Sequence, residues 1–310
     1  VDAVRPTGLG MRSTLAAAVD GLTGAAAHEA LRSTYRRLLL RLAARDLVGV
    51  VGFDDVAAEL ADLAGATIDA ALMVARAELP PEAVPCRLAV IGMGKCGGRE
   101  LNYISDVDVI FVAEPVRLAS SDASSVDETA ALRTATQLAT AMMRVCAPIW
   151  EVDAALRPEG KMGPLVRTLA SHTAYYQRWA KTWEFQALLK ARPVAGDVEL
   201  GQAYVDAMWP MVWEAGGRDH FVEDVQAMRR RVEAALPVGD ADRELKLGPG
   251  GLRDVEFAVQ LLQLVHGRDD DALRSGTTLV ALRELADGGY VGRDDAALLA
   301  QAYRFLRTLE

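Results

Sequence analysis

Apolar residues recur at three- and four-residue spacing through residues 12–80, with arginines between them. This spacing places apolar side chains along one face of an α-helix. A pair of prolines at 80–81 ends the helical pattern. The chain therefore predicts an N-terminal helical region over residues 1–82. The clearest members of its apolar face are Leu31, Tyr35, Leu38, Leu39 and Leu42.

The next section, residues 83–168, has the pattern of a small α/β core. Residues 87–91 form a short apolar run and residues 106–112 are rich in β-branched side chains, so both predict strands. A glycine cluster at 92–98 follows the first strand, and residues 99–104 leave room for a helix of about two turns. The predicted core is completed by a helix over roughly 127–146 and a third strand over 148–156.

The remaining residues, 169–310, predict a mainly helical domain with interruptions at the glycines of 216–217 and 246–251. The last residues keep an amphipathic helical spacing without a capping signal. We therefore expect a helical domain that is truncated at its C-terminus, in a chain that is part of a longer protein. The predicted fold class is α+β, with helices flanking a small sheet.

The composition is that of a folded protein, because 51% of the 310 residues are hydrophobic and charges of both signs are interspersed. We expect neither a signal peptide nor the stretch of roughly 20 apolar residues that crosses a bilayer. A formal net charge of −9 argues against non-specific nucleic-acid binding. Three scattered cysteines suit neither a disulfide framework nor a thiolate metal site. We expect a cytoplasmic protein with no membrane or nucleic-acid partner.

The glycine cluster satisfies the G-x-G-x-x-G pattern of dinucleotide-binding folds, but its surroundings do not. That fold needs a crossover helix of about a dozen residues and an acidic residue about 20 residues after the glycines. Here the acids open the second strand instead. A Walker A loop needs Ser or Thr after its lysine, whereas Cys96 follows Lys95. A nicotinamide or flavin site is therefore a minor alternative.

Two acidic residues, Asp106 and Asp108, begin the second predicted strand. Because side chains alternate across a strand, both project from one face, and Val107 and Val109 from the other. A solvated strand end is a sufficient explanation for an isolated Asp-x-Asp pair. A third acid, Asp153, lies in the next predicted strand among apolar neighbours. Three carboxylates on neighbouring strands predict an oxygen cage for one or two Mg²⁺ ions that bind a phosphate-bearing substrate.

Four motifs in sequence order resemble the bifunctional glutamine synthetase adenylyltransferase/adenylyl-removing family, whose members contain two nucleotidyltransferase domains of the polymerase-β type. The motifs are GKCGGRELNYISDVD at 94–108, VDAALRPEG at 152–160, WEFQALLKAR at 183–192 and KLGPGGLRDVEF at 246–257. The resemblance covers most of the chain beyond about residue 30. It implies a polymerase-β-like nucleotidyltransferase core with a small mixed sheet and a C-terminal helical bundle.

Two features resemble the N-terminal, adenylyl-removing half of that family in its actinobacterial form. They are the Glu-Leu-Asn triplet that ends at Asn102 and the Lys-Leu-Gly sequence at 246–248. The transferase half usually has glycine in place of this asparagine and lacks the Lys-Leu-Gly sequence. One departure is Ala155, where the family commonly has arginine. Arg157 is then the arginine of that segment that we expect to reach the site.

The resemblance implies Mg²⁺-dependent phosphorolysis of an adenylylated tyrosine of glutamine synthetase, which releases ADP and regulates nitrogen assimilation. Asp106, Asp108 and Asp153 would be the catalytic and metal-binding residues, and we favour two Mg²⁺ ions. The implied partners are adenylylated glutamine synthetase, phosphate and ADP, with glutamine and a PII-type signalling protein as regulators. An ATP-dependent adenylyltransferase and a non-catalytic regulatory module with the same fold are the alternative functions.

The same resemblance suggests a set of phosphate- and nucleotide-binding residues, in which backbone N–H groups of the glycines would face phosphate oxygens. Structural roles remain open for several of them. Lys95 and Arg99 could only solvate a helix, and Ser105 could cap the strand. Lys190 or Arg192 could instead pair with an acid such as Glu184. The whole set is Gly94, Lys95, Gly97, Gly98, Arg99, Ser105, Arg157, Lys161, Lys190 and Arg192.

Overall fold

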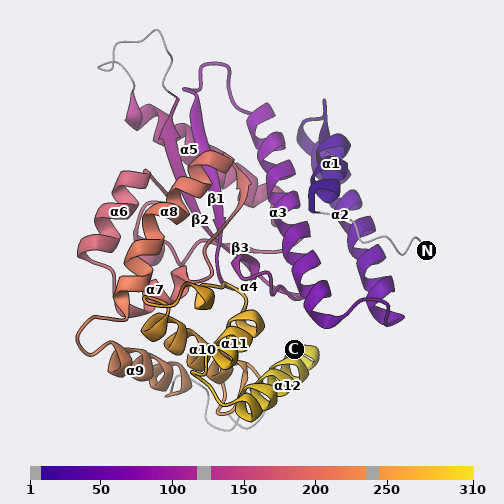
Figure 1. Ribbon diagram of the computed structural model, residues 1–310. Coiled ribbons are helices and arrows are strands. Elements are labelled where there is room, and N and C mark those ends of the chain that lie inside the picture. The colour runs from indigo at the N-terminus through magenta and orange to yellow at the C-terminus, as the bar shows by residue number, and fades with distance from the viewer. Residues whose placement is uncertain (1–7, 117–126, 235–243) are drawn as a thin grey trace. The chain divides into compact units, whose positions relative to one another are not determined.

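The computed structural model describes residues 8–116, 127–234 and 244–310 (Figure 1). The chain divides into two compact units. The first unit comprises the residues up to Tyr175 together with Ala191–Asp206, and the second comprises Tyr176–Lys190 with Ala207–Glu310. The predicted boundaries of three domains, at residues 82 and 168, stay a prediction.

The first unit begins with three helices whose apolar faces pack together. The longest of them, α3, is buried along most of its length, because small alanines and a glycine let neighbouring elements approach it closely. The helical spacing that the sequence shows before the prolines at 80–81 thus corresponds to helices in the structure. The three helices are α1 (Gly8–Val19), α2 (Gly24–Leu47) and α3 (Phe53–Ala77).

A five-stranded mixed sheet forms the rest of the core of this unit. Strand β1 pairs antiparallel with β2 on one side and with β5 on the other, and β2 pairs in parallel with β3 and β4. The fold class is α+β with a small mixed sheet, as predicted. The strands are β1 (Cys86–Gly92), β2 (Val107–Pro115), β3 (Val152–Asp153), β4 (Val166–Arg167) and β5 (Arg192–Gly196).

One face of this sheet is covered by helices α3 and α5 (Glu128–Cys146), which also contact each other. Alternate strand residues, including Val90, Val107 and Val109, are buried in a single hydrophobic cluster with them. Because strand side chains alternate, Asp108 projects from the opposite face. The acid is therefore separated by the sheet from the apolar core below it.

A one-turn helix, α4 (Gly94–Gly97), follows β1 directly, and the short 3-10 helix η1 (Gly160–Met162) follows β3. Helix α6 covers Leu169–Arg178 and helix α8 covers Val198–Ala215. The other helices lie in the second unit, where α10, α11 and α12 pack around one buried apolar cluster. They are α7 (Thr182–Leu188), α9 (Phe221–Ala234), α10 (Leu252–His266), η3 (Asp271–Leu273), α11 (Thr278–Asp287) and α12 (Arg293–Leu309).

Three local predictions are corrected by the structure. The short helix is α4, over the glycines, and not residues 99–104, because Arg99 adopts a left-handed φ of 58° and the N–H of Leu101 donates to the carbonyl of Ala57 on α3. The predicted strand at 148–156 is only the two-residue β3. Strand β5 was expected to be part of a helical domain; it is an edge strand, where Pro193 removes no hydrogen bond that the sheet requires.

Within the described residues, no helix is both long and apolar enough to span a membrane.

Candidate metal centre and glycine turn

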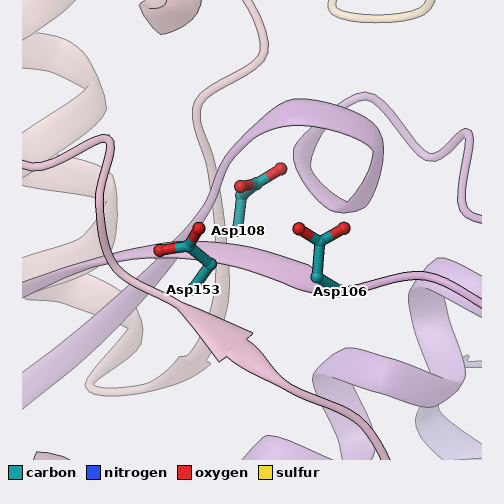
Figure 2. Close-up of side chains that lie close together, drawn as sticks. All are labelled: Asp106, Asp108 and Asp153. Carbon is teal, nitrogen blue, oxygen red and sulfur yellow. The ribbon is translucent and has the colours of Figure 1, made fainter. Parts of the chain in front are cut away.

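The three predicted acids lie together at one corner of the sheet (Figure 2). Asp106 immediately precedes β2, Asp108 is the second residue of β2, and Asp153 pairs directly with Asp108 across the parallel β2–β3 ladder. Figure 2 shows all three carboxylates on the same side of these strands. One oxygen atom of each carboxylate lies within 4.8 Å of those of the other two. We refer to these residues as the acidic triad.

The strand geometry explains why the triad converges. Side chains two residues apart in an extended chain project from one face, which brings Asp106 beside Asp108. The parallel register then brings Asp153 from a segment 45 residues further along the chain, because Val107 pairs with Val152 and Asp108 with Asp153. Val107 and Val152 are buried in the hydrophobic cluster of the first unit, and this packing holds the backbones of both strands in place. Two strands and one register are therefore sufficient to build the triad.

The composition of the triad suits a divalent cation. Three carboxylates at this separation repel one another unless a cation offsets their charge. Carboxylate oxygens are the ligands that Mg²⁺ prefers, and Mg²⁺ usually keeps some waters or phosphate oxygens as its other ligands. Asp106 is exposed and the other two acids are half-buried, which leaves the oxygens accessible to a phosphate-bearing substrate. The residues present therefore fit the predicted metal.

The glycine turn, residues 93–98, lies directly against Asp108. Gly94 has a left-handed φ of 50°, and a Cβ at this position would overlap Oδ2 of Asp108. The N–H of Met93 donates to the backbone carbonyl of Asp108 at 2.9 Å. Backbone and side chain of Asp108 are thus both in contact with the turn, so the position of the turn determines the space available to this carboxylate.

Two of the predicted phosphate-binding residues form polar contacts close to the triad. Ser105 Oγ donates to the backbone carbonyl of Asp106 at 2.9 Å, just before the first residue of β2. Arg157 donates to the carbonyls of Ala154 at 2.7 Å and Gly163 at 3.1 Å, and so closes the loop that follows β3. Burial lowers the pKa of Arg157, and the charge of nearby Asp153 opposes this shift. A phosphate-binding role for either residue stays a prediction.

Two other predicted arginines contact the glycine turn or the residues after it. Arg99 forms an ion pair of 2.7 Å with Asp62 of α3. Arg192 donates from Nε to the carbonyl of Gly97 at 3.0 Å and from Nη2 to the carbonyl of Cys96 at 2.9 Å. The sequence did not indicate either set of partners, because Asp62 lies in an unrelated helical pattern and β5 was not predicted.

The lysines have different environments. Lys161 is exposed on η1, and Lys95 is half-buried at the start of α4. Lys190 is buried in the second unit, where its Nζ lies 4.0 Å from Oε1 of Glu256 and 3.3 Å from Oγ1 of Thr278. Glu184 accepts a hydrogen bond from the N–H of Lys181 at the start of α7. The roles of the three lysines toward phosphate or nucleotide stay predictions.

Comparisons with known proteins agree with the motifs. Residues 8–207, which include the triad and the glycine turn, match the family of the glutamate-ammonia ligase adenylyltransferase. The chain belongs to this family. Residues 221–310 match a second family, that of the GlnD PII-uridylyltransferase. The family predicted from the four motifs is thereby confirmed, and the triad lies within the part of the chain that matches it.

Individual relatives extend this agreement to nearly the whole chain. The bifunctional glutamine synthetase adenylyltransferase/adenylyl-removing enzyme of Streptomyces avermitilis is 64% identical over 94% of this chain, which is 29% of the relative. The enzyme of the same name from Mycobacterium tuberculosis strain H37Rv is 58% identical over 94% of the chain and 28% of the relative. The enzyme of the same name from Corynebacterium diphtheriae is 57% identical over 93% of this chain and 27% of the relative. The chain thus spans less than a third of the length of these relatives.

Proposed function

We propose that this chain is the adenylyl-removing part of a bifunctional enzyme of this family. It catalyses phosphorolysis of the adenylylated tyrosine of glutamine synthetase and releases ADP. The observation that carries the proposal is the acidic triad, whose three carboxylate oxygens converge within 4.8 Å at the exposed corner of a nucleotidyltransferase-family sheet. The Glu-Leu-Asn triplet at 100–102 and the Lys-Leu-Gly sequence at 246–248 favour this half over the transferase half. A polymerase-β-like core belongs to the same proposal.

The reaction needs no nucleophile from the protein. An oxygen of inorganic phosphate attacks the phosphorus of the tyrosyl-AMP, the bond from phosphorus to the tyrosine oxygen breaks, and the tyrosine takes up a proton as ADP forms. Asp106, Asp108 and Asp153 would hold one or two Mg²⁺ ions, two in the arrangement that we favour, and bound Mg²⁺ would neutralise charge on the transferring phosphoryl group. Positioning and charge stabilisation provide most of the rate in phosphoryl transfer.

The chain's own residues would position the reactants. Asp153 Oδ1 accepts a hydrogen bond of 2.7 Å from the N–H of Ala155, which fixes one carboxylate orientation. The glycine turn lies against the carboxylate of Asp108 and would limit the positions that it can adopt. Among the basic residues named above, Lys95, Arg99, Arg157, Lys161 and Lys190 would bind phosphate or the nucleotide. The names of the relatives support glutamine synthetase as the protein substrate, and the second family match supports a PII-type protein as a regulator. Glutamine as a further regulator rests on the family resemblance alone.

A product assay tests the proposal. The chain is incubated with AMP-modified glutamine synthetase, phosphate and Mg²⁺, and the nucleotide released is identified by chromatography. We expect ADP, released only when phosphate and the metal are both present. The Asp106→Asn/Asp108→Asn double variant is the control and should release none.

The same assay distinguishes the alternative functions. Pyrophosphate formed from ATP and unmodified glutamine synthetase, without release of ADP from the modified form, would identify the chain as the transferase. Absence of both products would favour a non-catalytic regulatory module. Wild-type turnover by the double variant would show that the triad is not the catalytic centre.

A further inference from the structure

Arg192 is placed to hold the glycine turn rather than to meet a substrate. It is the first residue of β5, and its backbone lies opposite Gly92, the residue just before the turn. Its side chain donates two hydrogen bonds to consecutive carbonyls, those of Cys96 and Gly97, at the end of α4. One residue thus contacts the turn at both ends. The last carbonyls of a helix have no donor within the helix. The carbonyl of Cys96 also accepts from the N–H of Arg99 at 3.3 Å, so Arg192 adds a second bond there and a bond to the carbonyl of Gly97.

The side of the sheet on which Arg192 lies supports this role. Val194 belongs to the cluster packed against α3 and α5. Arg192 pairs directly with Gly92, which is two residues along β1 from Val90 of the same cluster. Paired residues share a face, so Arg192 projects toward α3 and α5 as well. Asp108 projects from the opposite face, because its neighbours Val107 and Val109 are in that cluster. The arginine and the catalytic carboxylates thus approach the glycine turn from opposite faces of the sheet.

The charges around Arg192 also belong to the helical face. Burial lowers the pKa of its guanidinium, while the charge of Asp62 opposes that shift. Asp62 is on α3 and is already paired with Arg99, which continues the chain from the turn. Asp62 thus influences two arginines: it pairs with Arg99 and favours the charge of Arg192, which is bonded to the carbonyls of the turn.

The consequence for the site follows from Gly94. Because a Cβ at Gly94 would overlap Oδ2 of Asp108, a displacement of the turn changes the position that this carboxylate can occupy. We propose that Arg192 is a positioning residue, which fixes the backbone of the glycine turn and through it the metal-binding carboxylate of Asp108. The inference rests on the proposed function for the identity of the site. It replaces the phosphate-binding role suggested for Arg192 by the family resemblance.

The test compares Arg192→Lys with Arg87→Lys. Lysine keeps the charge but does not donate two N–H groups in the fixed geometry of a guanidinium. Arg87 is the matched control, because it also makes a two-bond contact, to Asp197 at 2.7 and 2.8 Å, but near the opposite end of β1. Binding of Mn²⁺ without phosphate or substrate is measured by electron paramagnetic resonance. We expect Arg192→Lys to weaken Mn²⁺ binding by about 10- to 100-fold, as is common for residues that orient metal ligands, and Arg87→Lys to change it less than about twofold.

Two further measurements separate positioning from anion binding. Amide hydrogen exchange in residues 93–99 should become several-fold faster in Arg192→Lys, without metal, while exchange in β1 is unchanged. In the phosphorolysis assay, kcat should fall while the KM for phosphate stays within about twofold. Arg192→Gln, which shortens the side chain and also removes its charge, should speed hydrogen exchange in residues 93–99 at least as much as Arg192→Lys.

Each outcome bears on one proposal or both. Unchanged Mn²⁺ binding and exchange in Arg192→Lys, with a raised KM for phosphate, would overturn the positioning role and leave the proposed function intact. Wild-type protein that binds no Mn²⁺ would overturn the proposed function, and this inference with it. If the variant is globally destabilised, hydrogen exchange will be faster throughout the first unit and not only in residues 93–99. That result would also contradict a local positioning role.

Discussion

Gly94 and Asp108 are packed so closely that glycine is required at position 94. A Cβ there would overlap Oδ2 of Asp108, and the backbone of Gly94 has a left-handed φ of 50°. The glycine pattern that superficially resembles a dinucleotide-binding loop thus serves a different purpose in this chain. It allows a one-turn helix to lie directly against a carboxylate of the acidic triad.

Gly94→Ala should therefore impair the site more than it impairs folding. The added methyl group displaces Asp108 or the turn, so we expect Mn²⁺ affinity and phosphorolysis to fall at least about tenfold. Gly49→Ala is the matched control, since Gly49 has a φ of 71° and nothing within 4 Å of its Cβ position. Both variants should lose about 1–2 kcal/mol of unfolding free energy from backbone strain, measured by urea denaturation. Equal metal affinity in the two variants would contradict the packing argument.

Replacement of single triad acids by asparagine should remove activity without loss of stability. Asp106→Asn, Asp108→Asn and Asp153→Asn each remove one of three charges that repel, so the free energy of unfolding without metal should stay the same or rise slightly. Phosphorolysis at saturating Mg²⁺ should fall by at least about a hundredfold, because a metal ligand is lost. Asp20→Asn, at an exposed position, is the control. A triad variant that is clearly less stable would indicate a structural role for that carboxylate.

The triad could be predicted from the sequence because it depends on a strict period. Alternation along one strand placed Asp106 and Asp108 on the same face, and the motif around Asp153 indicated a neighbouring strand. The length of that strand was overestimated, because only Val152 and Asp153 pair with β2. Two paired residues are nevertheless sufficient to bring the third carboxylate to the other two.

The support of the site could not be predicted in the same way, because it depends on long-range contacts. Residues 192–196 contain a proline and end in glycine, which is typical of a loop, and they form a strand only because β1 offers an unpaired edge. Residues 99–104 have the composition of a helix, but they form a turn and a loop that contacts α3, for example through the Arg99–Asp62 ion pair. Neither outcome is encoded in local periodicity.

We expect protonation of the buried His172 to lower the free energy of unfolding in acid. Burial lowers its pKa to about 4, and the ring lies 3.3 Å from the carbonyl of Phe111 and edge-on to Tyr204. The unfolded chain binds a proton near pH 6.5 and the folded chain near pH 4, so stability falls as the pH decreases between these values. Between pH 7 and pH 5 this residue alone should account for about 2 kcal/mol, measured by urea denaturation. His172→Gln should show a correspondingly flatter pH dependence, and an unchanged slope would show that His172 is not the group responsible.

A buried ion pair between α2 and α3 should be more important to stability than any surface pair in the first unit. Arg45 and Glu59 form a charged hydrogen bond while only 5% and 1% of their side chains are exposed. Glu59→Gln leaves a buried guanidinium without its counter-charge, so we expect a loss of about 3–5 kcal/mol in the free energy of unfolding. The double variant Arg45→Met/Glu59→Leu should recover most of that loss, because no charge remains buried. The control is Glu29→Gln, which removes an exposed pair with Arg32 and should cost less than about 1 kcal/mol. Equal losses in the single and double variants would show that packing, and not the unpaired charge, determines the cost.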